Sequence, residues 1–215
     1  RARDHPLWHS AEENARIAAG IAPNLADADY ILGDALARQD AQNPSALSAL
    51  ARAEILTQEK ELLAAIISRR GEIYFAQGKF SAALEQFTRA RAIAPLDARP
   101  RTGFALTMVQ LEPAQRAQAT ALLQQVIADA PWYSAAYSAL ANFAEADQDF
   151  ARTEQWFKTG LEKNPNEPHL LFARGQFYAR QKRFQDARAT FIDALKFETH
   201  ADDLQSIARA LADLP

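Results

Sequence analysis

The sequence predicts an all-α protein in which antiparallel helical hairpins stack along one axis. Between Ala64 and Pro95, small and apolar residues recur at helical spacing in two halves, which Gly78 separates. A similar order of residues returns about every 34 positions, and no stretch alternates apolar and polar residues as a strand does. Because one hairpin cannot bury its own apolar face, repeated hairpins indicate a solenoid in which each repeat covers the next.

The recurrence is clearest at the positions that have to pack. Each first helix has a small residue where backbones approach closely, at Gly71, Ala105, Ala141 and Gly175. Each second helix has a large apolar residue, at Phe87, Leu123, Phe157 and Phe191, and a smaller residue one turn earlier, at Ala83, Ala119, Thr153 and Ala187. We therefore expect these positions to form the core between successive hairpins.

The N-terminal part departs from this pattern. Residues 8–24 predict one helix of an incomplete hairpin, and residues 25–58 predict a divergent hairpin whose second helix starts at Pro44. We expect Thr57 to be the N-cap of the next helix, which is lengthened toward Gln77. A single helix continuous over 45–77 is the alternative, because no strong breaker lies within it.

Four regular repeats follow, and a last helix closes the chain. The repeats are expected over residues 59–97, 98–133, 134–167 and 168–200, with extra residues around Pro113 lengthening one inner turn. The amphipathic stretch 201–215 predicts a capping helix that covers the open apolar end. We expect one continuous array over residues 1–215.

The order of small, aromatic and proline positions resembles the tetratricopeptide repeat (TPR) motif. The resemblance implies a right-handed α-solenoid whose first helices line a concave groove that holds a peptide or a helix of another protein. It implies neither catalysis nor a cofactor. The abundance of Ala, Arg and Gln with few Lys resembles the composition of bacterial TPR proteins. Such proteins often serve envelope assemblies such as pilus, polysaccharide export or cell-wall machinery.

The motif also implies which side chains face the groove and contact the partner. Ser68 and His169 occupy such positions, and the predicted partner-binding residues are Tyr30, Asp34, Arg38, Glu72, Phe75, Arg99, Thr102, Leu106, Val109, Ser138, Asn142, Glu145, Phe172, Gln176 and Arg180, together with Trp132 in an inter-repeat turn. The apolar members are either anchors for a bound segment or packing residues between repeats. Glu72 would repel a carboxylate, which argues against the two-carboxylate clamp of chaperone-binding TPR domains.

Other functional classes find little support in the sequence. With 24 basic and 27 acidic residues, the net charge of −3 gives no electrostatic reason to expect nucleic acid. There is no cysteine, no glycine-rich phosphate loop and no apolar run of about 20 residues that would insert into a membrane. His5 and His9 have metal-ligand spacing, but Pro6 between them disfavours a regular helix, so no metal is expected there.

The main hypothesis is therefore a non-catalytic scaffold for another protein. The alternative is a regulatory or substrate-docking domain of a larger membrane-bound enzyme, such as a glycosyltransferase or a polymerase. A third hypothesis is self-association through the incomplete N-terminal hairpin. Because the chain starts at Arg1, we expect an excised fragment or a processed product. The compartment, bacterial periplasm or cytoplasm, stays open, as does a membrane tether outside residues 1–215.

Overall fold

The computed structural model describes residues 25–199 and 201–215, and before them Glu13, Ile17 and Gly20. It divides into two compact units, which meet between Ala119 and Thr120 and are described separately. Across the described residues the secondary structure is helical, without a strand, as predicted. The helix predicted over 8–24 lies outside the described residues.

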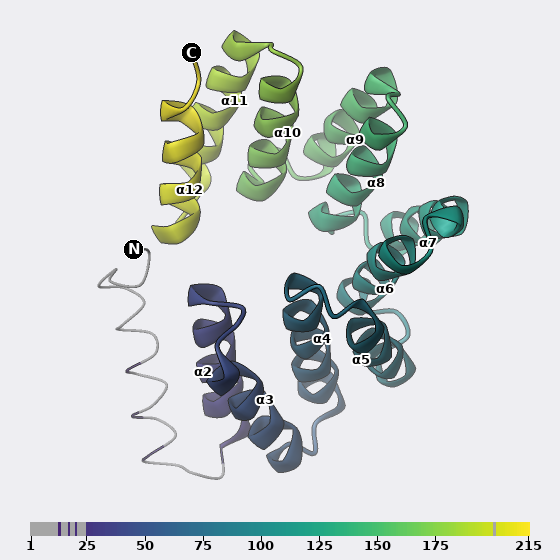
Figure 1. Ribbon diagram of the computed structural model, residues 1–215, viewed down its shortest axis with the longest axis vertical. Helices are drawn as coiled ribbons and strands as arrows, with labels where there is room; N and C mark the ends of the chain where they lie inside the picture. Colours follow the sequence, from purple (N-terminus) through teal and green to yellow (C-terminus); the bar gives the residue numbers. More distant parts are fainter. Residues whose placement is uncertain (1–12, 14–16, 18–19, 21–24, 200) are drawn as a thin grey trace. The chain divides into compact units, whose positions relative to one another are not determined.

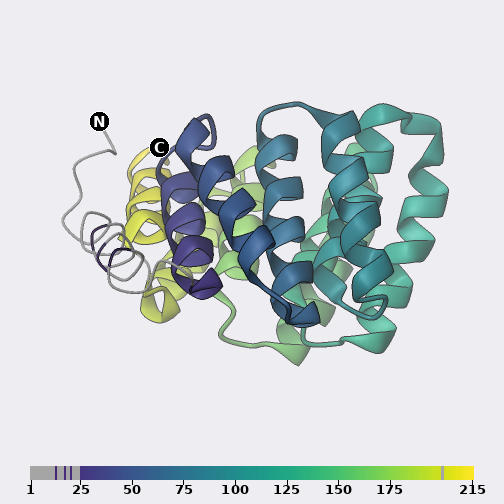
Figure 2. The ribbon, with the colours of Figure 1, turned by 90° about the horizontal axis from the view of Figure 1, so that it is seen from below.

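From residue 25 onward, the described part of the first unit contains two complete hairpins followed by the first helix of a third. Its helices are α2 (Ala26–Gln39), α3 (Pro44–Leu56), α4 (Lys60–Ala76), α5 (Phe80–Ile93) and α6 (Ala98–Leu111), and the 3-10 turn η2 (Pro113–Gln115) follows. Helix α2 packs along α3 and α4 along α5, as Figures 1 and 2 show, and α5 also packs on α6. The turn η2 occupies the place where the extra residues were predicted to lengthen the inner turn.

The second unit contains two further hairpins and the terminal helix. Helix α7 (Arg116–Asp129) begins at the end of the first unit and lies mostly in the second. The helices after it are α8 (Ser134–Ala146), α9 (Phe150–Lys163), α10 (Pro168–Arg180), α11 (Phe184–Phe197) and α12 (Ala201–Ala212). Figure 1 shows α12 beside α11, on which it packs through buried Ile207. In the described residues, every helix is too short or too polar to span a lipid bilayer.

The junction between α3 and α4 corrects one detail of the sequence prediction. Thr57 ends α3, because its N–H donates to the carbonyl of Ala53 and its backbone then turns extended. Its hydroxyl accepts from the N–H of Glu59, and α4 begins only at Lys60. The prediction of Thr57 as N-cap of α4 was therefore wrong. The break between the helices excludes a continuous helix over 45–77, whereas the extension toward Gln77 is confirmed.

The core forms at the predicted positions. Phe87, Leu123, Phe157 and Phe191 are all buried, as are the smaller residues one turn before them. Phe87 shows why its neighbours are small. A Cβ atom added to Gly71 or Gly103 would lie 2.8 or 2.4 Å from its ring, distances that side-chain packing does not tolerate.

Three hairpins turn through one residue in the left-handed region. This residue is Gly78 at φ 73°, Gln148 at φ 60° or Lys182 at φ 60°. Its N–H, and that of the next residue, bond back to carbonyls of the helix that has just ended. Gly78 suits this conformation, while Gln148 and Lys182 adopt it at an energetic cost.

Candidate partner-binding face

In the first unit, the first helices of three successive repeats lie next to one another, with α2 against α4 and α4 against α6. Six side chains from these helices form one connected set, which we call the unit 1 network: Tyr30, Asp34, Arg38, Arg69, Glu72 and Arg99. Five of the six are predicted groove residues. The structure therefore brings residues that were predicted to line the groove, from three repeats, into mutual contact.

The centre of the unit 1 network is a two-pronged contact between Arg99 and Glu72. Arg99 donates from Nε to Oε1 of Glu72 at 2.6 Å and from Nη2 to Oε2 at 2.7 Å. Its Nη1 donates to the hydroxyl of Tyr30 at 3.2 Å. This planar arrangement fixes both side chains more tightly than a single-point ion pair does.

Arg69 extends the network from Glu72 to the first repeat. Its Nη1 donates to Oε2 of Glu72 at 3.0 Å, and its Nε forms an ion pair with Oδ1 of Asp34 at 2.7 Å. Arg38 donates from Nε to the other oxygen of Asp34 at 2.9 Å. One chain of contacts thus links α2, α4 and α6.

The protonation of the network follows from these contacts. Burial alone would raise the pKa of Glu72, but the hydrogen bonds and charges of Arg99 and Arg69 outweigh it and hold that pKa below its usual value of 4.5. Burial would likewise lower the pKa of Arg99, but its bonds to Glu72 and Tyr30 raise it. Both groups therefore carry their charges at neutral pH.

The other predicted groove residues of the first unit differ in exposure. Phe75 and Leu106 are half-buried, and the ring of Phe75 meets that of Phe80 edge-on at 5.3 Å between centroids. Thr102 and Val109 are buried, with 3% and 6% of their surfaces exposed. Their burial gives them a packing role, and their contact with a partner stays a prediction.

In the second unit, a similar ion pair joins the first helices of adjacent repeats. Arg180 of α10 donates to both oxygens of Glu145 of α8, at 2.8 and 2.7 Å, and these bonds raise the pKa of Arg180. Asn142 and Gln176, about one helical turn before Glu145 and Arg180 respectively, are exposed, and Ser138 is half-buried. Phe172 is half-buried against the core ring of Phe191 at 5.6 Å.

Trp132 is the most accessible of the predicted aromatic contacts. It is 66% exposed and meets the Tyr133 ring edge-on at 6.1 Å. Its carbonyl accepts a hydrogen bond from Asn164, which fixes the turn that carries it. An indole held on a fixed backbone is a common form of interface anchor, and contact of Trp132 with a partner stays a prediction.

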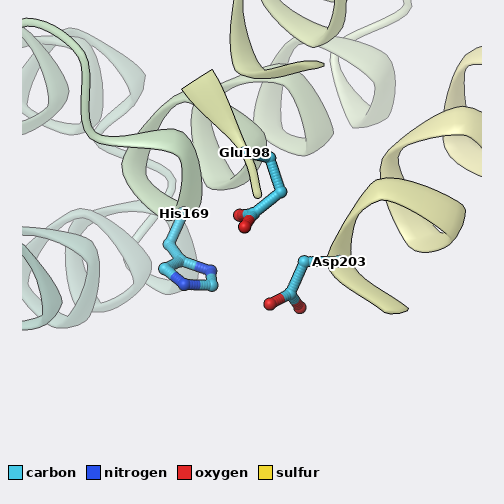
Figure 3. A group of neighbouring side chains, drawn as sticks. All are labelled: His169, Glu198 and Asp203. Atoms are coloured by element: carbon cyan, nitrogen blue, oxygen red, sulfur yellow. The ribbon is translucent and has the colours of Figure 1, made fainter. Parts of the chain in front are cut away.

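Two sets of contacts were not found from the sequence. Arg69 was missed because its carboxylate partners lie in two different repeats, although the Arg69-to-Glu72 spacing on one helix was a usable signal. A second group joins His169 with Glu198 and Asp203, whose ligand atoms all lie within 4.8 Å of one another (Figure 3). No short spacing motif links these three positions.

Comparison with known proteins agrees with this geometry. Residues 64–97 match the family model of the tetratricopeptide repeat. Among curated proteins, no sequence match is found. The chain therefore carries a tetratricopeptide repeat, and the solved structures below show that it has the fold of tetratricopeptide repeat proteins.

The similar solved structures are distant in sequence. TTC0263, a thermophilic TPR protein of Thermus thermophilus, aligns with a TM-score of 0.69 at 19% identity, over 87% of this chain and all of the other. PilF of Pseudomonas aeruginosa aligns at 0.58 and 14% identity, over 94% and 89%. YrrB, described as a TPR protein with an unusual peptide-binding site, aligns at 0.52 and 16% identity, over 93% and 100%.

Proposed function

We propose that this chain is a non-catalytic scaffold that binds a segment of another protein on the first-helix faces of its repeats. The observation that carries the proposal is the unit 1 network. Ion pairs removed from water contribute little to stability by themselves, because desolvation offsets their attraction. Arg99 and Glu72 are nevertheless only 28% and 32% exposed and are held at fixed angles. Side chains fixed in this way bind a partner at a smaller entropic cost.

The chemistry of the face suggests what kind of segment it suits. Half-buried Leu106 and Phe75 lie on the same two helices, α6 and α4, as the charged pair of Arg99 and Glu72. A segment that offers both apolar and hydrogen-bonding side chains would use both kinds of position. YrrB, which shares this fold, is described as having a peptide-binding site, and this supports the proposal for the present chain.

Selection from a displayed peptide library against the purified 215-residue chain tests the proposal. The affinity of an enriched peptide is then measured for the wild type, Arg99→Ala and Leu106→Glu. Arg89→Ala is the matched control, since Arg89 is also an arginine paired with a glutamate, Glu54, but lies on a second helix. Circular dichroism verifies that each variant is folded.

We expect Arg99→Ala and Leu106→Glu to lower the affinity at least tenfold, while Arg89→Ala leaves it within about twofold. Equal binding by all four proteins would overturn the assignment of the first unit's face. The same peptide is then measured with Phe172→Glu and Trp132→Ala, which test the predicted contacts of the second unit.

The cellular assembly or larger protein in which this chain acts stays a hypothesis. Service in a bacterial envelope assembly is expected from the family resemblance alone, and the similarity to PilF concerns the fold alone at 14% identity. The alternative, a docking domain of a larger membrane-bound enzyme, is tested by the sequence of the full-length protein, where a catalytic domain beside the repeats would favour it.

A further inference from the structure

We propose that His169, Glu198 and Asp203 form a binding site for a divalent metal ion of the zinc type, which fastens α12 to the hairpin of α10 and α11. This inference does not rest on the proposed function, because binding of a metal ion by these three residues requires no partner segment. Figure 3 shows the three side chains directed toward a common space. Their nitrogen and oxygen ligand atoms all lie within 4.8 Å of one another.

The three side chains come from three separate elements. His169 lies in the first turn of α10, Glu198 directly follows α11, and Asp203 lies in the first turn of α12. Residues that merely share a helix surface are neighbours by periodicity, whereas these three meet only because the tertiary structure brings three chain segments together. A shared ligand would therefore cross-link all three segments.

The donor atoms fit zinc. Zinc binds imidazole nitrogen at about 2.0–2.1 Å and carboxylate oxygen at about 2.0–2.2 Å, usually with four ligands in a tetrahedron. Two ligands of one tetrahedral ion are then roughly 3.3–3.6 Å apart. From the 4.8 Å limit the ligand atoms need to approach by at most about 1.2–1.5 Å, and exposed His169 and half-buried Asp203 have room for this rotation.

The electrostatics of the group favour a cation. Two carboxylates from different segments face the same space, and Glu198 is more than nine-tenths buried, with only 7% of its surface exposed. Like charges held this close repel each other, and a divalent ion replaces the repulsion with attraction to both. The N–H of Thr199 donates to Oε1 of Glu198 at 2.8 Å, which orients the carboxylate as outer-sphere hydrogen bonds orient metal ligands.

The expected consequence is a more firmly docked terminal helix. Helix α12 packs on the hairpin through Ile207, which joins Leu171 and Phe191 in one buried cluster, and through partly buried Ala210 and Leu211. A metal held by Asp203 adds a second attachment near the beginning of α12. Water would complete the coordination, since three protein ligands leave one position of the tetrahedron open.

Zinc titration of the complete chain tests the site. The protein is first treated with EDTA and dialysed, and the affinity and stoichiometry for Zn²⁺ are measured by calorimetry with a competing chelator. The test variants are His169→Ala and Asp203→Asn. The matched controls are His9→Ala, which removes a histidine elsewhere, and Asp213→Asn, which removes the same charge just after α12.

We expect one ion per chain, an affinity at least tenfold weaker in His169→Ala and Asp203→Asn, and unchanged binding in both controls. Hydrogen exchange in α12 should slow on zinc addition in the wild type and in Asp213→Asn, but not in Asp203→Asn. Circular dichroism shows whether the variants are folded. Either of two results would overturn the proposal: no stoichiometric binding by the wild type, or full affinity in His169→Ala.

Discussion

Arg99 of α6 and Glu72 of α4 meet through two parallel hydrogen bonds of 2.6 and 2.7 Å, and so join the first helices of consecutive repeats. Glu72 is shared, because Arg69 bonds to the same carboxylate at 3.0 Å. The contact therefore belongs to a network and not to an isolated surface pair, which is the condition under which charge pairs matter for stability.

Removing Arg99 should destabilise the first unit by about 1–3 kcal/mol, between the values for exposed and buried ion pairs. The loss arises because Glu72 stays partly buried with only Arg69 to compensate it. Urea unfolding of Arg99→Ala, Glu72→Ala and the double variant measures the interaction free energy between the two side chains, which we expect to be about 0.5–3 kcal/mol. Strictly additive losses would show that the two side chains do not stabilise each other.

The same carboxylate predicts a pH dependence. The folded pKa of Glu72 lies below its ordinary value of 4.5, so the unfolded chain binds this proton more readily than the folded one. Glu72 therefore contributes stability above pH 4.5, and the contribution is lost as the pH falls through the folded pKa. We expect the stability difference between wild type and Glu72→Gln to shrink from pH 7 toward pH 3 in urea titrations. A constant difference would contradict the assignment.

The sequence predicted the helices well and the polar contacts poorly, for physical reasons. Core positions such as Phe87 and Phe191 follow the helical period, which one sequence displays directly. Thr57 was misplaced because threonine serves either end of a helix, and the local backbone decides which. The contact of Arg69 with Asp34, and the meeting of His169 with Asp203, depend on how separate segments pack. Local spacing does not encode that packing.

The contact between Gly103 and Phe87 predicts a steric effect. A Cβ at position 103 would lie 2.4 Å from the ring of Phe87, which is only 1% exposed. We expect Gly103→Ala to destabilise the protein by about 1–3 kcal/mol, although alanine is intrinsically the better helix former by about 1 kcal/mol.

A variant with a smaller residue at position 87 separates the steric clash at position 103 from the gain in helix propensity. Phe87→Leu removes the ring atoms that the new methyl group would strike, at its own cost in packing. In that background Gly103→Ala should be neutral or stabilising in thermal unfolding. If the alanine costs the same with Leu at position 87, the strain does not come from the ring.

The left-handed residue between α10 and α11 offers a stabilising change. Lys182 holds φ at 60°, a conformation that costs a residue with a Cβ about 1–2 kcal/mol and glycine almost nothing. Glycine also adds freedom to the unfolded chain, so Lys182→Gly should gain only about 0.5–1 kcal/mol. Lys182→Ala is the control, because it removes the lysine side chain but keeps the Cβ, and it should give no gain. Gly78→Ala completes the comparison: apart from its neighbours in the chain, no atom lies within 4 Å of a Cβ at position 78, so the stability lost in this variant measures the backbone cost alone. Equal melting temperatures for Lys182→Gly and Lys182→Ala would show that backbone strain at this turn does not limit stability.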